Sequence, residues 1–173
     1  MEEVISILHT FFNPKSIAVI GASEDSRKLG HVVLKSMIDA GFKGHIYPIN
    51  THRSSILGLK AYSSVLKVPG IIDLAVLVIP KQAVLQVMEE CGKKKIRNAV
   101  IISSGFSEIG DVKSEESLKA ISKKNHIRVI GPNCLGILVP KKNLDMIFLP
   151  RSRFKRPNAG GIAFISQSGA LGS

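Results

Sequence analysis

The stretch Ser16-Ile-Ala-Val-Ile-Gly21-Ala-Ser23 decides the fold of this chain. It is a short apolar run, rich in β-branched residues, that ends at a glycine. Such runs are typical of a strand inside a parallel sheet, which is buried on both faces. A polar loop over residues 22–28 follows, and apolar residues then recur at helical spacing from Leu29 until Gly41, a natural helix stop. The sequence therefore predicts a strand, a loop and a helix here.

The same alternation continues along the chain. We expect further strands over residues 45–50, 71–79, 98–104 and 127–131. Apolar periodicity predicts a helix over residues 84–91 that ends at Gly92, and another helix that begins at Ser114. Five strands that alternate with helices or crossovers indicate an α/β fold with a doubly wound, mainly parallel, Rossmann-like sheet.

The last part of the chain changes character. We assign residues 1–150 to the Rossmann-like domain and residues 151–160, which are basic and contain Pro and Gly, to a linker. The sequence pattern predicts a new strand over residues 162–166, followed over residues 167–172 by a turn into a new helix. Because two such elements cannot bury themselves alone, residues 161–173 are interpreted as the start of a second α/β domain. The alternative is that this strand extends the edge of the first sheet.

The charge balance favours an anionic partner. The chain has 24 Lys and Arg against 13 Asp and Glu, a net charge of +11. Nucleic acid, acidic lipid and phosphorylated small molecules would all fit such a charge. Nucleic acid is disfavoured because there is no Trp and aromatic residues make up only 5%. The longest apolar run is too short to span a bilayer, and the first residues lack a leader pattern, so we expect a cytoplasmic protein with no membrane partner.

Metal and catalytic signals are missing from the pattern. Cys91 and Cys134 lie far apart, and neither has a second cysteine or a histidine at a zinc-ligand spacing. The sequence also contains no recognisable pair of a catalytic acid and a catalytic base. We therefore expect neither a metal site nor catalytic residues in this chain.

The loops that follow the five strands are the candidate ligand site. In an open parallel sheet, ligands bind beyond the carboxyl ends of the strands, at the switch point in strand order. Nearly all residues in these loops are small, polar or turn-forming, which allows the backbone to approach a phosphate or a flat ring. The loops are residues 21–23, 50–53, 80–81, 103–106 and 131–134.

The first two loops argue against NAD. The first loop does not fit the G-x-G-x-x-G fingerprint, because Ser23 replaces the second glycine and the next glycine is Gly30. An NAD site also has an acid at the end of the second strand, where this chain has Asn50. His52 and Arg53 follow closely, and basic groups there would suit a ribose phosphate. NADP and coenzyme A (CoA) both carry one.

Four motifs give the chain a family resemblance. They are Phe12-Asn-Pro-Lys-Ser-Ile-Ala-Val-Ile-Gly-Ala-Ser23, Ile102-Ser-Ser-Gly-Phe-Ser-Glu108, Gly131-Pro-Asn-Cys-Leu-Gly136 and Ile165-Ser-Gln-Ser-Gly-Ala170. In this order they resemble the NDP-forming acyl-CoA synthetases, which include the ADP-forming acetyl-CoA synthetases and the succinyl-CoA synthetase α subunit. The resemblance implies a CoA-binding first domain of an ADP-forming acid–CoA ligase. It also implies that residues 161–173 begin a flavodoxin-type second domain.

The resemblance assigns a role to each loop. The loop Gly21-Ala22-Ser23, with Lys28 and Gly30 after it, would meet the nucleotide phosphates. Asn50 with its neighbours and the turn Ile79-Pro80 would hold the adenosine. The loops Ser103-Ser104-Gly105 and Pro132-Asn133 would lie toward the pantetheine thiol. The family often has Asn-Pro-Lys after the second strand, so His52 or Arg53 would replace that lysine. A Gly21→Val substitution is expected to abolish CoA binding while leaving the fold intact.

The resemblance also implies that catalysis needs other domains. The family passes phosphate through a histidine in its second domain, and none of His9, His31, His45, His52 and His126 matches that position. The chain is therefore expected to bind CoA or acyl-CoA, and to depend for catalysis on phosphohistidine and ATP-grasp domains in the same chain or in a partner chain. A second copy of this chain, in a homo-oligomer, is a further candidate partner. The alternatives are an NADP-binding oxidoreductase, a redox-sensing module and a nucleic-acid-binding regulator.

Overall fold

The main sheet has five parallel strands. The computed structural model describes residues 8–172. The strands are ordered β2-β1-β5-β6-β7, which is the order 2-1-3-4-5 of a doubly wound sheet. Their bounds are β1 (Ser16–Ile20), β2 (His45–Ile49), β5 (Leu74–Leu77), β6 (Asn98–Ile101) and β7 (Arg128–Ile130). The predicted α/β, Rossmann-like fold and its five strands are confirmed, although the third strand begins later than expected because Ile71 is 82% exposed.

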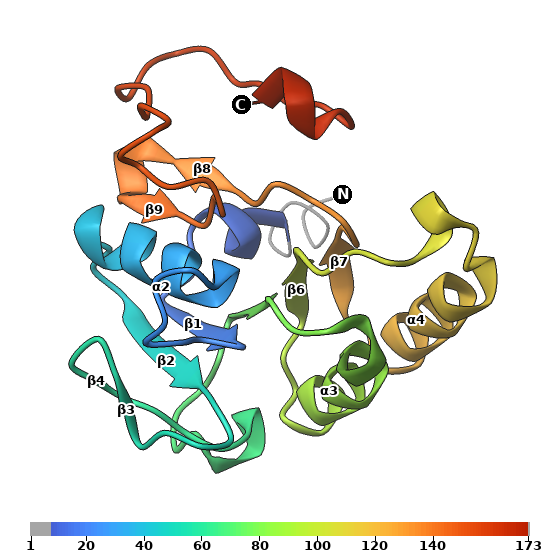
Figure 1. The fold of residues 1–173 in the computed structure, drawn as a ribbon. Helices are drawn as coiled ribbons and strands as arrows, with labels where there is room; N and C mark the ends of the chain where they lie inside the picture. Colours follow the sequence, from blue (N-terminus) through green and yellow to red (C-terminus); the bar gives the residue numbers. More distant parts are fainter. Residues whose placement is uncertain (1–7, 173) are drawn as a thin grey trace.

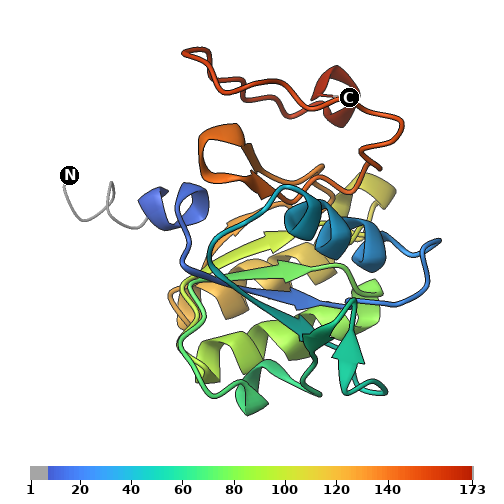
Figure 2. The same ribbon diagram turned by 90° about the vertical axis from the view of Figure 1, so that its left-hand side faces the viewer.

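Helices cover both faces of this sheet (Figures 1 and 2). On one face lies α2 (Leu29–Asp39), and on the other lie α3 (Lys81–Lys93) and α4 (Val112–Lys124). The crossover from β2 to β5 has no α-helix and instead contains a hairpin of β3 (Ser55–Ile56) and β4 (Leu59–Lys60), followed by the short helix η1 (Val65–Lys67). A second hairpin, β8 (Leu138–Val139) and β9 (Leu144–Asp145), packs beside α2. The remaining short helices are η2 (Ser107–Ile109), η3 (Pro140–Lys142) and η4 (Gly169–Gly172).

Alternate residues of each central strand enter opposite halves of the core. In β1, Ala18 and Ile20 pack with α3 and α4, whereas Ile17 and Val19 pack with α2. This division follows from the period of two along a strand. Val33 of α2 is fully buried in its half, as the helical spacing predicts, whereas Leu29 was expected there and is 47% exposed.

Two helix boundaries differ from the prediction. Gly92 does not end α3, because the helix continues to Lys93. A Cβ at Gly92 would lie 2.2 Å from the side-chain Oδ1 of Asn125, so this glycine is required by packing rather than by the helix end. Helix α4 begins before Ser114, since the carboxylate of Asp111 accepts a hydrogen bond from the Ser114 N–H and caps the helix.

A buried carboxylate fixes the segment after β9. Asp145 is 1% exposed and accepts hydrogen bonds from Arg151 Nη1 at 2.7 Å and Arg156 Nε at 2.9 Å. The Ile147 N–H donates to the same carboxylate. Residues 151–156, which belong to the predicted linker, are thus held to the domain.

The expected strand over residues 162–166 is not formed. This segment lies apart from the sheet beyond the β8–β9 hairpin (Figures 1 and 2). Ile162 and Ile165 are 97% and 95% exposed. A strand needs a neighbouring backbone to pair with, and none of the sheets in the described part of the chain includes these residues. The alternative, an added strand at the sheet edge, is therefore not found either. The assignment of residues 161–173 to a second domain stays a prediction.

Asp145→Asn tests the buried ion pairs. The substitution leaves the Arg156 guanidinium largely buried without its counter-charge, so we expect a loss of about 3 kcal/mol in the free energy of unfolding. Urea unfolding measures it. Lys35→Ala is the control, because it removes the exposed pair of Lys35 and Asp39 and should change stability by less than about 0.5 kcal/mol. Equal effects of the two substitutions would contradict the role given to Asp145.

Candidate functional site

Hydrogen bonds, together with a close backbone contact between the loops after β1 and β5, join the loops at the carboxyl ends of the strands into one row. Asn50 Nδ2 donates to the Ala22 carbonyl at 2.9 Å and links the loops after β2 and β1. The Ser103 hydroxyl donates to the Ile79 carbonyl at 2.6 Å and accepts from the Ile79 N–H at 3.2 Å, which links the loops after β6 and β5. The Asn133 N–H donates to the Ser103 carbonyl at 3.0 Å and adds the loop after β7. The predicted loops therefore do meet at one edge, here called the carboxyl edge.

The loops after β1 and β5 touch at the switch point of the sheet. Gly21 has a φ of +90°, and a Cβ there would lie 2.1 Å from the Val78 carbonyl oxygen. A Cβ at Gly30, in the first turn of α2, would lie 1.9 Å from the Gly21 carbonyl oxygen. Gly21 thus provides the tight turn, and Gly30 provides the close packing of helix on strand. These are two of the three roles of the dinucleotide fingerprint, spread over a longer loop.

The loop over residues 22–28 is held in shape by its own contacts. The Asp25 N–H donates to Ser23 Oγ at 3.1 Å, and His31 Nδ1 lies 3.1 Å from the Ser23 carbonyl oxygen. Asp25 pairs with Arg27 at 2.8 Å, and these hydrogen bonds from Arg27 hold the pKa of Asp25 well below its usual range. The side chain of Ala22 is fully buried, so this residue can meet a ligand only through its backbone.

A basic turn flanks this loop. The Asn50 carboxamide oxygen accepts hydrogen bonds from the N–H groups of His52 at 2.8 Å and Arg53 at 3.1 Å. Asn50 therefore organises the turn. The side chains of His52, Arg53 and Lys28 are exposed, and none of them forms an ion pair within residues 8–172.

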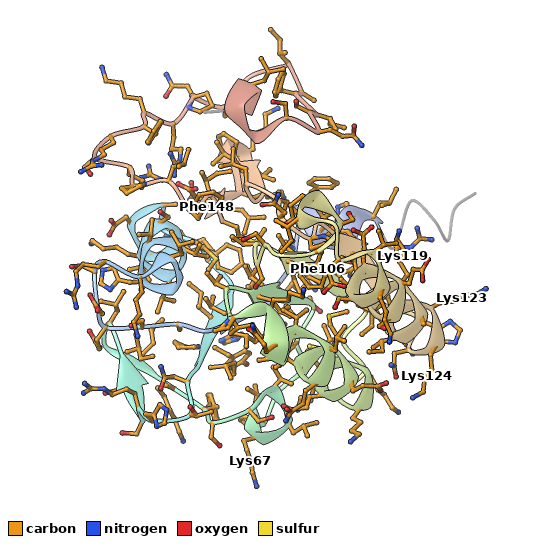
Figure 3. All side chains as sticks on the ribbon, turned by 45° about the vertical axis from the view of Figure 1, so that its right-hand side comes forward. Lys67, Phe106, Lys119, Lys123, Lys124 and Phe148 are labelled. Carbon is orange, nitrogen blue, oxygen red and sulfur yellow. The ribbon has the colours of Figure 1, made fainter. Side chains whose placement is uncertain are left out.

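The other half of the carboxyl edge contains exposed Ser104 and Asn133 beside buried Ser103. The peptide bond between Gly131 and Pro132 is cis. A hollow of about 330 Å³ opens next to Asn133 and is lined also by Gln167 and by Phe148. Figure 3 labels Phe148.

Three charged residues at this edge, Lys81, Glu108 and Asp111, were given no role by the sequence. The Lys81 ammonium pairs with Asp111 and lies 5.7 Å from the centre of the Phe106 ring, which Figure 3 labels. The Glu108 carboxylate accepts hydrogen bonds from the N–H groups of Gly105 and Phe106, and the first of these chiefly lowers the pKa of Glu108. Asp111 could have been found by its position three residues before Ser114, a common N-cap spacing. Lys81 lies in a predicted loop and Glu108 in one of the quoted motifs, but nothing in the sequence pattern indicated their partners.

Cys134 lies beside the site but is not poised for chemistry. Its thiol donates to the Ile101 carbonyl at 3.4 Å, and burial raises its pKa to about 11. Among the described side chains, no three His, Cys, Asp or Glu gather to hold a metal ion. No helix in residues 8–172 has the length and apolar character needed to cross a bilayer.

Comparison with known proteins gives a family and close relatives. Residues 15–140 match the family described as CoA binding domain. The chain is 49% identical over 158 residues to an ADP-forming acetate–CoA ligase of Methanocaldococcus jannaschii, covering 91% of this chain and 22% of that protein. It is 44% identical over 169 residues to the α subunit of ADP-forming acetate–CoA ligase II of Pyrococcus furiosus, covering 96% of this chain and 36% of the subunit.

A solved structure agrees with these relatives. Acetyl-coenzyme A synthetase 1 of Ca. Korarchaeum cryptofilum, in complex with phosphate and ADP, superposes with a TM-score of 0.90 at 44% identity. The match covers 95% of this chain and 35% of that chain. The chain thus spans between about a fifth and about a third of the length of these relatives.

The geometry corrects the expectation for Gly21→Val. A valine Cβ would collide with the Val78 backbone and would require a left-handed conformation that β-branched residues disfavour. We expect a loss of at least about 2 kcal/mol in unfolding free energy, together with any loss of binding. Thermal or urea unfolding measures it, and an unchanged stability would show that the two loops can separate freely.

Alkylation tests the state of the Cys134 thiol. With a pKa of about 11, roughly one thiol in a thousand is ionised at pH 8. We expect iodoacetamide to modify Cys134 in the folded chain more than tenfold more slowly than in urea, at a rate that still rises between pH 8 and pH 10. Peptide mass mapping separates this site from Cys91. A rate that levels off near pH 8 would contradict the raised pKa.

Proposed function

Since this chain belongs to the CoA binding domain family, within the ADP-forming acetyl-CoA synthetases, we propose that it binds CoA or an acyl-CoA across its carboxyl edge. The observation that carries the proposal is the switch point between β1 and β5, where Gly21 turns against Val78. Ligands of doubly wound sheets bind at such a point.

The phosphates of CoA would lie on the loop after β1. The backbone N–H groups of Ala22, Ser23 and Glu24 donate no hydrogen bond within the described part of the chain. Three successive N–H groups beside the start of α2 suit a pyrophosphate. Lys28 would add a positive charge at the same place. The long loop between Gly21 and Gly30 leaves this backbone open without the middle glycine of the fingerprint.

The adenosine end of CoA would lie by the turn after β2. Arg53 and His52 would contact the ribose phosphate, while Asn50 fixes the turn that carries them. Ile79 and Pro80 would contact the adenine. The pantetheine arm would run past Ser104 and Gly105 toward Asn133. This path follows the row of loops that the hydrogen bonds of Ser103 hold together.

The whole protein would be an ADP-forming acid–CoA ligase. The chain spans only 22% of the relative from M. jannaschii and 36% of the subunit from P. furiosus. We propose that phosphohistidine and ATP-grasp domains, in the same chain or in a partner subunit, complete the reaction. This domain would supply CoA in a fixed position and no acid, base or nucleophile of its own.

An NADP-binding module is the second candidate, because the basic turn at His52 and Arg53 would also suit the phosphate of NADP. Isothermal titration with CoA, dephospho-CoA, NADP and NAD separates the two. We expect CoA to bind most tightly and dephospho-CoA about tenfold more weakly, since the ribose phosphate loses a charge-assisted contact. Binding of NADP without binding of CoA would overturn the proposal.

Arg53→Ala tests the ribose-phosphate contact directly. We expect it to weaken CoA binding by about tenfold and to leave dephospho-CoA binding unchanged. Lys43→Ala is the matched control, because it removes one exposed positive charge near the start of β2, away from the carboxyl edge. If both substitutions weaken CoA binding equally, the effect comes from net charge and the assignment of Arg53 fails.

A further inference from the structure

Two neighbouring turns repeat one construction at the amino ends of β6 and β7. From the last residue of α3 the chain reads Lys93-Lys-Lys-Ile-Arg97, and from the last two residues of α4 it reads Lys123-Lys-Asn-His-Ile-Arg128. In each turn the isoleucine is buried, Ile96 at 0% and Ile127 at 5% exposure. The residue before it has a positive φ, +61° at Lys95 and +53° at His126. Each turn therefore buries one apolar side chain and directs its basic residues outward.

Packing places the two turns side by side. β6 and β7 are adjacent, and Asn98 lies opposite Arg128 in their register. Arg97 Nη1 donates to the Asn125 carbonyl at 2.9 Å, and Gly92 packs directly against Asn125. The two turns thus form one surface, here called the basic edge. Its basic residues are Lys93, Lys94, Lys95, Arg97, Lys123, Lys124 and Arg128.

Most of this charge is not neutralised. Lys124 pairs with Glu89 at 3.2 Å, and Lys94 donates to the Val68 carbonyl. In contrast, Lys95, Lys123 and Arg128 are exposed and form no ion pair within residues 8–172. Figure 3 shows Lys123 and Lys124 at the end of α4, pointing away from the body of the molecule.

Helix capping does not account for this concentration. Basic residues in a last helical turn offset the negative end of the helix dipole. Lys93, Lys123 and Lys124 occupy such positions, but α2 ends with no basic residue in its last turn. Lys95, Arg97 and Arg128 lie beyond the helices. They add positive charge that the helix ends do not require.

We propose that the basic edge is a docking surface for an acidic surface of another protein. The positive charge of the basic edge is complementary to an acidic protein surface, because a compact group of uncompensated cations attracts carboxylates and orients their approach. The basic edge is at the amino ends of the strands, opposite the carboxyl edge. A partner bound there leaves the carboxyl edge open, so the proposal does not depend on which ligand binds at that edge.

Other anionic partners fit the basic edge less well. The backbone N–H groups of a helix N-terminus, which often contact nucleic-acid phosphates, are not offered here, because α3 and α4 present their carbonyl ends. The two turns contain no Phe, Tyr or Trp to stack on a base. The apolar residues of the two turns, Ile96 and Ile127, are buried and cannot insert into a membrane.

The test measures the binding of a fluorescent poly-L-glutamate of about 30 residues by fluorescence anisotropy at physiological salt. A DNA duplex of equal charge and anionic phosphatidylserine vesicles are measured in parallel as alternative partners. The triple variant Lys95→Gln, Lys123→Gln, Arg128→Gln removes three charges from the basic edge. The control variant Lys141→Gln, Lys142→Gln, Lys155→Gln removes three exposed charges elsewhere. We expect the first to weaken poly-L-glutamate binding by about tenfold and the second by less than about twofold.

Three results would overturn the proposal: no binding of poly-L-glutamate, equal weakening in both variants, or tighter binding of the duplex or the vesicles than of poly-L-glutamate. Circular dichroism and thermal unfolding of both variants verify that they are folded. CoA titration of the same variants is a separate readout, and its outcome bears on the carboxyl edge alone.

Discussion

The close approach of three backbone segments at Gly21, Gly30 and Val78 is the constraint on which the rest of the structure depends. A Cβ at Gly21 would meet the Val78 carbonyl, and a Cβ at Gly30 would meet the Gly21 carbonyl. Without side chains at these two positions, β1 can end directly against the loop after β5, and α2 can begin directly on the loop after β1. This contact is at the switch point of the sheet, where a doubly wound fold binds its ligand.

The row of hydrogen bonds extends this constraint along the whole carboxyl edge. Asn50 joins two loops and shapes the basic turn, and Ser103 joins the loops on either side of it. Because Asn50 and Ser103 are occupied in holding loops together, the groups left for a ligand are backbone N–H groups, exposed basic side chains and the exposed polar side chains of Ser104 and Asn133. That combination favours a phosphorylated, nucleotide-like ligand over a substrate that needs catalytic side chains.

The sequence predicts the strands well because buried parallel strands are apolar on both faces and end at Gly, Pro or Ser. The sequence also identifies the residues of the candidate ligand site, because the carboxyl ends of parallel strands all lie at the same edge of the sheet. It does not predict the role of Asn50, because the hydrogen bond to Ala22 exists only once β1 and β2 are neighbours. Gly92 was misassigned for a similar reason, since its contact with Asn125 lies 33 residues away in the chain. The contacts of Lys81 and Glu108 could not be predicted either, because their partners come from loop geometry.

In the proposed complex, CoA lies along the carboxyl edge, with its phosphates on the loop after β1. Titration of CoA into the ¹⁵N-labelled chain, followed by backbone amide chemical shifts, tests this most directly. We expect the largest changes in chemical shift at Ala22, Ser23 and Glu24, smaller ones around Arg53 and Ser104, and none at Lys95 or Arg128. Changes centred on the amino ends of the strands, or unchanged amides at residues 22–24 under saturating CoA, would contradict it.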